Sequence, residues 1–176
     1  MNIRRNNQAA LTGVERHLLG NDIIVSKTDP KGRITYVNDV FCSISGYSEA
    51  EMIGAPHSVI RHPDMPRAVF KLLWESILSG NEIFAYVVNR CKNGDHYWVL
   101  AHVTPSYDLD GKLVGYHSNR RAPKASALEV IRPIYRDLLQ IEKTQGSREG
   151  LIASSAALED LLRQKKLAYD QFVLTI

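Results

Sequence analysis

A ten-residue stretch, HSVIRHPDMP at residues 57–66, concentrates side chains that can hold a charged ligand. Arg61 can pair with a phosphate or with Asp64, and the imidazoles of His57 and His62 can bond to ring or ribose oxygens. The two prolines of the stretch restrict its backbone. Taken alone, the stretch favours a helix-capping Asp64 and a surface ion pair between Arg61 and Asp64, because residues of these types usually have those roles.

The sequence gives weaker support for a metal site, a disulfide or an enzyme active site. His57, His62 and Asp64 are residue types that zinc accepts, but their loop spacing is weak evidence for a zinc site and two prolines crowd it. Cys42 and Cys91 match no metal spacing, and we expect both to be free thiols. The sequence has no G-x-S-x-G, P-loop, H-E-x-x-H or kinase signature, so we expect a protein that is not an enzyme.

The segment before this stretch predicts two strands and two short helices. In residues 22–39, β-branched residues flank an Asp-Pro-Lys-Gly sequence, which indicates a strand, a tight turn and a second strand. Asn38 or Asp39 can cap a helix that Gly46 ends. A Ser-x-x-Glu pattern at residues 48–51 is typical of a capping box and predicts a second short helix.

The segment after the stretch predicts a longer helix and three strands. Residues 66–80 begin with a proline, carry apolar residues on one stripe and end at a glycine, all of which favour a helix. Strand-like runs follow at residues 82–91, 96–108 and 112–121. Because Lys-Asn-Gly-Asp at residues 92–95 is a strong hairpin signal, we expect the three runs to form an antiparallel meander.

The two ends of the chain differ in pattern from the middle. Near the N-terminus, GVERHLLG could form two turns of helix that end at Gly20. From Ala125 onward the pattern is helical, with Pro133 expected to kink the first helix or start a new one, and with a break at residues 144–150. The expected parts are an N-terminal arm (1–20), an α+β domain (21–122) and a C-terminal helical extension (123–176).

Composition limits the functions to consider. The 176 residues are 44% hydrophobic and 23% charged, enough for one globular core and an appendage. The net charge of +3 comes from 22 Lys and Arg scattered among 19 Asp and Glu, so no basic stripe predicts nucleic-acid binding. The longest apolar run, IFAYVV, is far below the roughly 20 residues of a membrane span, and no signal-peptide pattern opens the chain. We therefore expect a cytoplasmic protein without direct membrane insertion.

The order of these elements and three motifs resemble a PAS domain, and in particular the FAD-binding PAS domain of aerotaxis receptors. The motifs are YVNDVFCSISGYS, GAPHSVIRHPDMP and NRCKNGDHYWV, and the resemblance covers about residues 21–121. It implies an α+β fold, in which a five-stranded antiparallel sheet carries helices on one face, and a non-covalently bound FAD. The sequence departs from the aerotaxis group at Ile83 and Phe84, where that group commonly has a tryptophan followed by a small residue.

The resemblance also implies which residues hold the cofactor. Arg61, His62 and Asp64 become members of the FAD site, and His57 precedes them. The set of candidate cofactor-binding residues is Asn38, His57, Arg61, His62, Asp64, Trp74, Asn89 and His117. His117 is included because light-sensing flavin-binding PAS domains carry a glutamine near this point of the last strand, although strand alternation allows it equally to face the other side of the sheet. Those domains also need a reactive cysteine where this chain has Arg61 and His62, so photoadduct chemistry is not expected.

The residues of the meander agree with a bound ring. By alternation, one face carries Ala85, Val87, Asn89, Val99, Ala101 and Val103. Small side chains on a core face leave volume that something must fill. Asn89 is the strongly polar member, and a buried carboxamide needs partners such as the pyrimidine edge of a flavin. Hydrogen bonds to the backbone at a bulge would also satisfy Asn89, and this alternative stays open.

By this resemblance, we expect a sensor of redox state or oxygen that signals through protein contacts to chemotaxis or aerotaxis machinery. Alternatives are a PAS module that dimerises or binds a metabolite without redox chemistry, and a haem-binding gas sensor with His57 or His62 as axial ligand. An apolar stripe at residues 151–174 favours a homodimer that docks on a chemoreceptor or other signalling protein. The stripe could instead pack back on the outer face of the sheet, at Phe84, Tyr86, Trp98 and Leu100.

Overall fold

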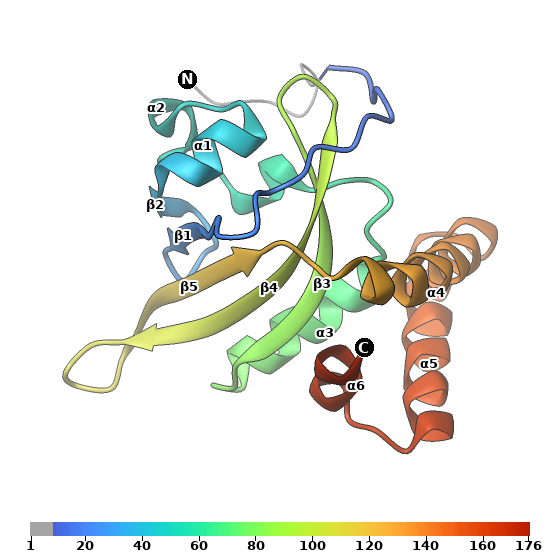
Figure 1. Cartoon of the computed structure of the whole chain (residues 1–176). Coiled ribbons are helices and arrows are strands. Elements are labelled where there is room, and N and C mark those ends of the chain that lie inside the picture. Colours follow the sequence, from blue (N-terminus) through green and yellow to red (C-terminus); the bar gives the residue numbers. More distant parts are fainter. Residues whose placement is uncertain (1–8) are drawn as a thin grey trace.

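The computed structural model of this chain describes residues 9–176 as a five-stranded antiparallel sheet with helices packed around it (Figure 1). The strands are β1 (Ile24–Thr28), β2 (Ile34–Val37), β3 (Ile83–Arg90), β4 (His96–Tyr107) and β5 (Leu113–Arg121), in the spatial order β2-β1-β5-β4-β3. The helices are α1 (Asp39–Ser45), α2 (Glu49–Met52), the 3-10 helix η2 (His57–Ile60), α3 (Arg67–Leu78), α4 (Ala125–Thr144), α5 (Ser147–Lys165) and α6 (Tyr169–Thr175). The expected α+β class and the five antiparallel strands are confirmed.

The short helices begin and end where the sequence predicts. The side chain of Asn38 accepts a hydrogen bond from the Phe41 N–H at 3.1 Å and caps α1. Gly46 ends α1 with φ 75°, a conformation that glycine adopts without steric cost. Ser48 and Glu51 form both hydrogen bonds of a capping box at the start of α2. These local interactions set the helices against the inner face of the sheet.

Strand register places the small residues of the meander under α3. Ala85 pairs with Ala101 and Val87 with Val99, so their side chains share the inner face. Asn89 pairs with Tyr97 on the same face. Helix α3 crosses this face. Because the side chains beneath it are small, a cavity remains between the helix and the sheet.

Residues 9–20 of the N-terminal arm are not helical, so the predicted helix at residues 13–20 is wrong. These residues run extended beside the β3–β4 hairpin (Figure 1). The Thr12 N–H donates to the Gly94 carbonyl at 3.1 Å, and the Arg16 N–H donates to the His96 carbonyl at 2.7 Å. Two helical turns are too short to be stable alone, and hydrogen bonds to the hairpin satisfy the arm's backbone instead.

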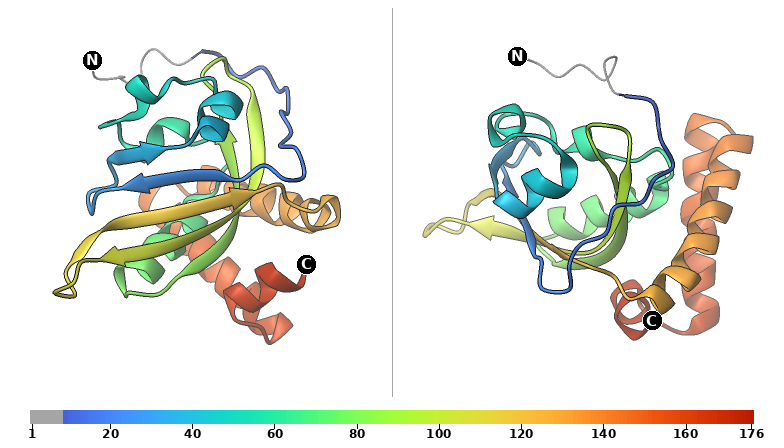
Figure 2. Two further views of the ribbon diagram at one scale, coloured as in Figure 1. Left: turned by 60° about the vertical axis from the view of Figure 1, so that its left-hand side comes forward. Right: turned by 45° about the horizontal axis from the view of Figure 1, so that its top comes forward.

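The C-terminal helices α4 and α5 lie side by side as a hairpin, as Figure 2 shows. Helix α4 continues through Pro133 as one element, so the predicted possibility of a new helix starting there is wrong. The break expected between the helices is present at Gln145 and Gly146, and a second break at Lys166, with φ 55°, separates α5 from α6. Among residues 9–176, no helix combines the length and the apolar character that crossing a membrane would need.

The extension covers the outer face of its own sheet. The Tyr135 hydroxyl donates to the Tyr86 carbonyl at 2.6 Å, and the rings of Trp98 and Tyr135 lie 5.9 Å apart. Phe172 and Val173 of α6 are 2% and 0% exposed. Helix α6, at the end of the apolar stripe, therefore packs against β3, and α5 packs against α3 and α4 of the same chain. This favours the alternative in which the stripe packs back on its own chain, while the homodimer stays a prediction.

A buried carboxylate joins the C-terminal hairpin to α3. Glu142 of α4 accepts hydrogen bonds from the backbone N–H groups of Arg67 and Ala68, at 3.1 and 3.0 Å, and so caps α3, whose N-cap Pro66 has no side-chain acceptor. The Arg67 side chain and the Ser154 hydroxyl also donate to it, each at 3.0 Å. Burial opposes the charge of this carboxyl, but these donors outweigh burial and lower the pKa of Glu142.

Candidate functional site

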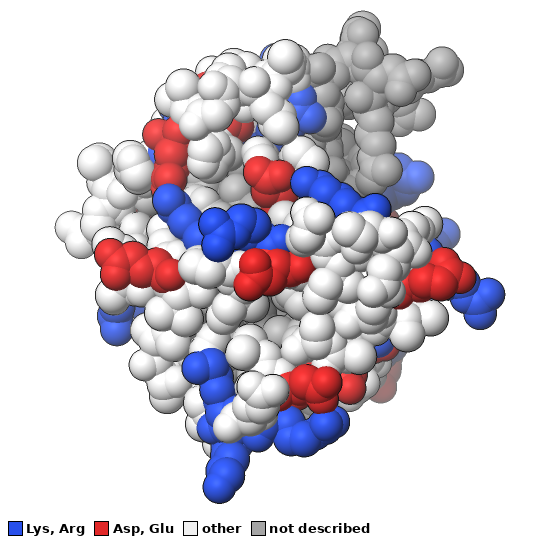
Figure 3. All heavy atoms as spheres, turned by 90° about the vertical axis from the view of Figure 1, so that its right-hand side faces the viewer, with Lys and Arg blue, Asp and Glu red and all other residues white. Residues whose placement is uncertain are grey.

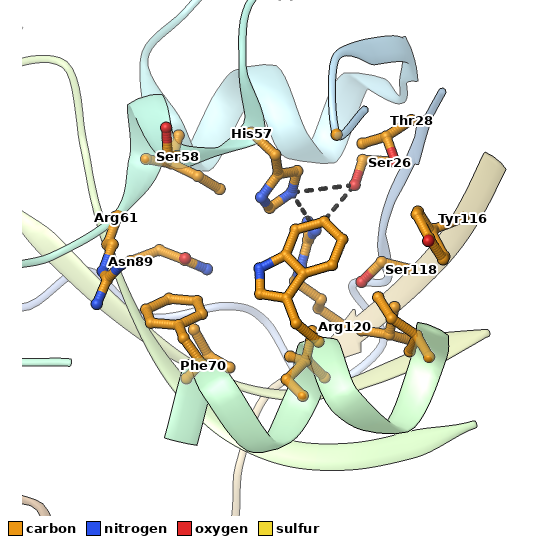
Figure 4. A pocket seen from close by; sticks show the side chains of 18 residues that line it. Ser26, Thr28, His57, Ser58, Arg61, Phe70, Asn89, Tyr116, Ser118 and Arg120 are labelled. Carbon is orange, nitrogen blue, oxygen red and sulfur yellow. Dashed lines mark hydrogen bonds between the residues drawn. The ribbon is translucent and has the colours of Figure 1, made fainter. Parts of the chain in front are cut away.

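A cavity of about 150 Å³ lies between the inner face of the sheet and α3 (Figure 4). Apolar side chains of α3, β3 and β4 form most of its wall. Cavities of about this size accept a small aromatic ring. Its hydrogen-bonding and charged side chains include Ser26, His57, Arg61, Asn89, Ser118 and Arg120.

Four of the predicted site residues meet at this cavity: His57, Arg61, Trp74 and Asn89. The backbone of Arg61 forms an isolated antiparallel bridge with Asn89, which ties the loop after η2 to β3. Asn89 is 3% exposed, and its Nδ2 has no partner among the described residues. The alternative in which the backbone fully satisfies Asn89 does not hold for this amide nitrogen, which is the group a ligand would have to satisfy.

Trp74 forms part of the boundary between the cavity and solvent. It is 39% exposed and meets Tyr116 edge to face, with ring centroids 5.6 Å apart. Gly32 lies close by, since a Cβ at this position would be 3.4 Å from the indole. Gly32 and Trp74 thus close one side of the cavity by direct packing.

Asn38 and His117 do not reach the cavity. Both ends of the Asn38 amide are used locally, because Oδ1 accepts from Val25 and Phe41 and Nδ2 donates to Ile23. On β5 the alternation places Tyr116, Ser118 and Arg120 toward the cavity, so the intervening His117 faces the other side. Its Nε2 lies 3.0 Å from the Asn119 Oδ1 there. The structure thus favours the second of the two orientations that alternation allowed for His117.

His62 and Asp64 also lie outside the cavity and shape the loop that carries Arg61. His62 is buried, and its Nδ1 accepts a hydrogen bond from the Asp64 N–H at 3.1 Å. Burial lowers the pKa of His62, which keeps the ring available as an acceptor. The Asp64 side chain is 66% exposed, and the capping role that its position suggested belongs to Glu142.

Arg120 is the cavity residue that sequence reasoning missed. It is 4% exposed, and its Nη2 donates to the Ser26 Oγ at 2.8 Å and to the His57 Nε2 at 2.6 Å (Figure 4). Its Nη1 is buried with no partner among residues 9–176, and no carboxylate of that range lies within 4.0 Å of it. Burial lowers the pKa of Arg120 to about 10, so the group is a cation at neutral pH.

His57 is the neutral partner of this cation. Burial and the neighbouring Arg120 lower the pKa of His57 to about 3. A neutral imidazole can accept the hydrogen bond from Arg120, which a protonated ring could not. The pair therefore presents one positive charge to the cavity.

Residues 34–120 match the PAS fold family. This part of the chain is a PAS domain.

Two known proteins are similar in sequence to this PAS domain. The aerotaxis receptor of Escherichia coli (strain K12) is 36% identical over 144 residues, which cover 82% of this chain and 28% of the receptor. A nitrogen fixation regulatory protein of Klebsiella pneumoniae is 27% identical over 99 residues, 56% of this chain and 20% of that protein. The chain thus spans less than a third of the length of these relatives.

Solved structures share the fold of the PAS domain. A light-oxygen-voltage domain studied with a flavin analogue superposes with a TM-score of 0.56 at 16% identity, over 65% of this chain and 86% of that one. The dark structure of the blue-light photoreceptor Aureochrome1 LOV gives 0.55 at 21% identity, over 66% of this chain and 85% of that one. At these identities the likeness shows the fold alone.

The described part of the chain does not place residues for photoadduct chemistry at the cavity or for a metal site. Neither Cys42 nor Cys91 is among the residues that line the cavity, and both are free thiols. Within residues 9–176, no group of three or more His, Cys, Asp or Glu side chains is placed to hold a metal ion. The cavity therefore offers hydrogen-bond donors and one buried cation.

The sequence did contain a signal for Arg120. Alternation along the last strand of the PAS domain puts Tyr116, Ser118 and Arg120 on one face, and a serine and an arginine on a core-facing set are unusual. The pairing of β5 with β1 and the backbone hydrogen bond from His57 to Gly32 together bring Arg120 to His57, which lies 63 positions away.

Proposed function

We propose that the PAS domain binds FAD non-covalently in the cavity between α3 and the sheet, and acts as a sensor of redox state or oxygen rather than as an enzyme. The observation that carries the proposal is a set of buried polar atoms without partners among the described residues. They are Asn89 Nδ2, Tyr116 Oη, Ser118 Oγ and Arg120 Nη1, all on residues that line the cavity. Buried groups of this kind normally have partners, so a ligand with acceptors is expected to supply them.

A flavin ring matches this donor set. The ring is flat and apolar on its faces, as the walls from α3, β3 and β4 require, and its edge carries carbonyl oxygens and ring nitrogens that can accept hydrogen bonds. Asn89 and Arg120 would hold that edge, and Arg61 would pair with phosphate on the tail. The solved light-oxygen-voltage domain studied with a flavin analogue shares the fold and supports this choice.

When bound, a flavin supplies reversible electron transfer coupled to proton uptake. The chain's own part is to respond to the charge in the cavity. Arg120 lacks a carboxylate partner within residues 9–176, so it would stabilise negative charge that is added to the cavity. The same charge would attract the guanidinium and weaken its hydrogen bond to His57. Because Arg120 lies on β5 and its partner Ser26 on β1, such a change would reach the sheet directly.

The signalling role rests on likeness to the aerotaxis receptor of Escherichia coli, which this chain matches over 144 residues. We propose that the domain acts in the cytoplasm and reports to a chemoreceptor or another signalling protein by direct contact. A homodimer is also part of this proposal.

An absorbance spectrum of the purified protein tests the proposal. We expect two flavin bands, and chromatography of the ligand released by heat should identify FAD. Oxidised and dithionite-reduced samples should differ in hydrogen exchange at β1 and β5. A Soret band would support the haem alternative, and a protein that binds no flavin even after incubation with it would overturn the proposal.

A further inference from the structure

The first turn of α3 is bonded to the C-terminal hairpin through two side chains, Glu142 and Arg67. Glu142 of α4 accepts from the first two N–H groups of α3 and from the Ser154 hydroxyl of α5. The Arg67 guanidinium donates to the Ser147 carbonyl at 2.6 Å and to the Gly146 carbonyl at 3.5 Å. The beginning of α3 is therefore tied to α4, to α5 and to the turn between them.

The same helix forms one wall of the cavity. Its lining side chains begin about one turn after Arg67 and are those of Phe70, Leu73, Trp74 and Ile77. Hydrogen bonds between successive turns make an α-helix move as a unit over such a short distance. A displacement of the first turn of α3 is therefore carried to the wall of the cavity.

The opposite wall, β3, is bonded to the same extension. The Tyr86 carbonyl accepts from the Tyr135 hydroxyl of α4 at 2.6 Å, and the Phe84 N–H donates to the Asp170 carboxylate of α6 at 3.2 Å. This strand also places Asn89 in the cavity. Helix α6 packs against β3 and α5 packs against α3 (Figure 1), so the extension holds both walls.

A break in the helical chain separates the two attachments. Helix α5 ends at Lys165, and α6 begins at Tyr169. Lys166 has φ 55° and is the only non-glycine residue within 9–176 with a positive φ, a conformation that L-residues seldom adopt. Because α5 is held at α3 and α6 at β3, a change in the distance between the walls would be taken up at this break.

We infer that the C-terminal extension clamps α3 and β3 and thereby sets the width of the cavity between them. The coupling is reciprocal: an occupant that moves α3 away from β3 would strain the clamp, and a protein that pulls on α5 or α6 would change the room for an occupant by the same free energy. This coupling needs no particular ligand, so it is independent of whether the domain binds a flavin. It gives the extension control over the cavity in addition to its cover of the sheet.

A double-mutant cycle on the full chain, measured by urea unfolding, tests the clamp. Ala101 lines the cavity from β4 and is 2% exposed, so Ala101→Phe places a ring in the cavity as a built-in occupant. With the clamp intact, α3 cannot move to make room, and the added bulk should destabilise the fold. Glu142→Gln keeps the size of the side chain but sets an amide group among hydrogen-bond donors, which should loosen the first turn of α3.

The expected result is a coupling between two substitutions that lie on different elements. Ala101→Phe should change the unfolding equilibrium constant at least about fivefold less in the Glu142→Gln background than in wild type. Ala50→Phe, at an exposed position of α2, is the control and should have the same effect in both backgrounds within about twofold. If a variant does not fold, Ala101→Leu is the smaller insertion, and Tyr135→Phe loosens the clamp at β3 by removing one hydroxyl.

Hydrogen exchange gives a second readout. In Ala101→Phe, exchange should rise at residues 163–172, around the helix break, and stay as in wild type at residues 48–53. Additive changes in both cycles, those with Glu142→Gln and with Tyr135→Phe, would overturn the clamp, because independent sites give additive free energies. An equal rise in exchange throughout the chain would also overturn it, since that reports a general loss of stability. Neither result would touch the flavin proposal, which the absorbance spectrum tests separately.

Discussion

The guanidinium of Arg120 donates to the imidazole of His57 across a distance of 2.6 Å, inside a PAS domain where neither group has a carboxylate partner within the described residues. The two residues come from β5 and η2. Burial and this contact lower the pKa of His57 and keep it neutral, and Arg120 is a buried cation beside the cavity. The stability and the ligand preference of the domain both follow from this pair.

His57 should make the protein less stable in mild acid. Its pKa falls from 6.5 to about 3 on folding, so between these pH values the unfolded chain binds a proton that the folded chain does not. Stability therefore falls as the pH drops below 6.5, by up to about 1.4 kcal/mol per pH unit from this group. Between pH 6.5 and 5, the free energy of unfolding, measured in urea, should fall by about 1 to 2 kcal/mol less in His57→Gln than in wild type. Part of the slope persists because the pKa of His62 is lowered too. Equal slopes in wild type and His57→Gln would contradict the assignment.

Arg120→Met should stabilise the protein without ligand while weakening flavin binding. A buried cation without a carboxylate partner is costly, and methionine fills a similar volume, so we expect a gain of about 1 to 2 kcal/mol in the free energy of unfolding. Flavin affinity should fall at least roughly tenfold, because a charged donor to the ring edge is lost. Thermal unfolding of the flavin-free protein and a flavin titration measure the two effects. A destabilised variant with normal flavin affinity would show that Arg120 serves the fold instead.

Asn89→Leu should reduce flavin affinity at least roughly tenfold with little loss of stability. The Nδ2 of Asn89 has no partner in the described chain, so an apolar replacement removes a group that folding leaves unsatisfied. Fluorescence titration and a melting curve separate binding from folding. Asn81→Leu, at an exposed position before β3, serves as the control and should bind flavin as wild type does. Unchanged affinity in Asn89→Leu would remove this residue from the site.

Glu142→Ala should destabilise the protein by about 2 to 4 kcal/mol, because it leaves two N–H groups of α3 and the Arg67 side chain without their buried acceptor. Chemical denaturation gives the value. Glu159→Ala removes an exposed carboxylate of α5 and should change stability by less than about 0.5 kcal/mol. Similar values for both variants would mean that the joint between α3 and the hairpin contributes little.

Deletion of residues 147–176 should destabilise the domain and lower its solubility. Leu158, Phe172 and Val173 are buried against the rest of the protein, so their removal exposes apolar surface on the sheet and on α4. We expect a lower melting temperature and a larger apparent mass in light scattering. A truncated protein with wild-type melting temperature and mass would show that the extension is dispensable for the fold.

Much of the fold could be predicted because its signals are local. The Asn38 cap, the Gly46 stop and the Ser48–Glu51 capping box are formed by residues within a few positions of one another, and all three are present. Alternation also placed Asn89 on the inner face of the meander correctly. Local signals failed where longer-range contacts compete with them, as in the arm at residues 13–20, which pairs with the β3–β4 hairpin instead of forming a helix.

The candidate site also has one part that the sequence predicts and another that only the tertiary structure decides. The sequence by itself determined that residues 57–66 contribute polar side chains to the site, which in the structure are those of His57 and Arg61, and that a strand face of small residues leaves space. Residue type and periodicity are written along the chain. Only the tertiary structure decided that Arg120 meets His57, that His117 faces the other side, and that Glu142 and the C-terminal hairpin close on α3 and the sheet. Strand pairing and helix docking bring together residues tens of positions apart, and no local pattern in one sequence specifies which of them will meet.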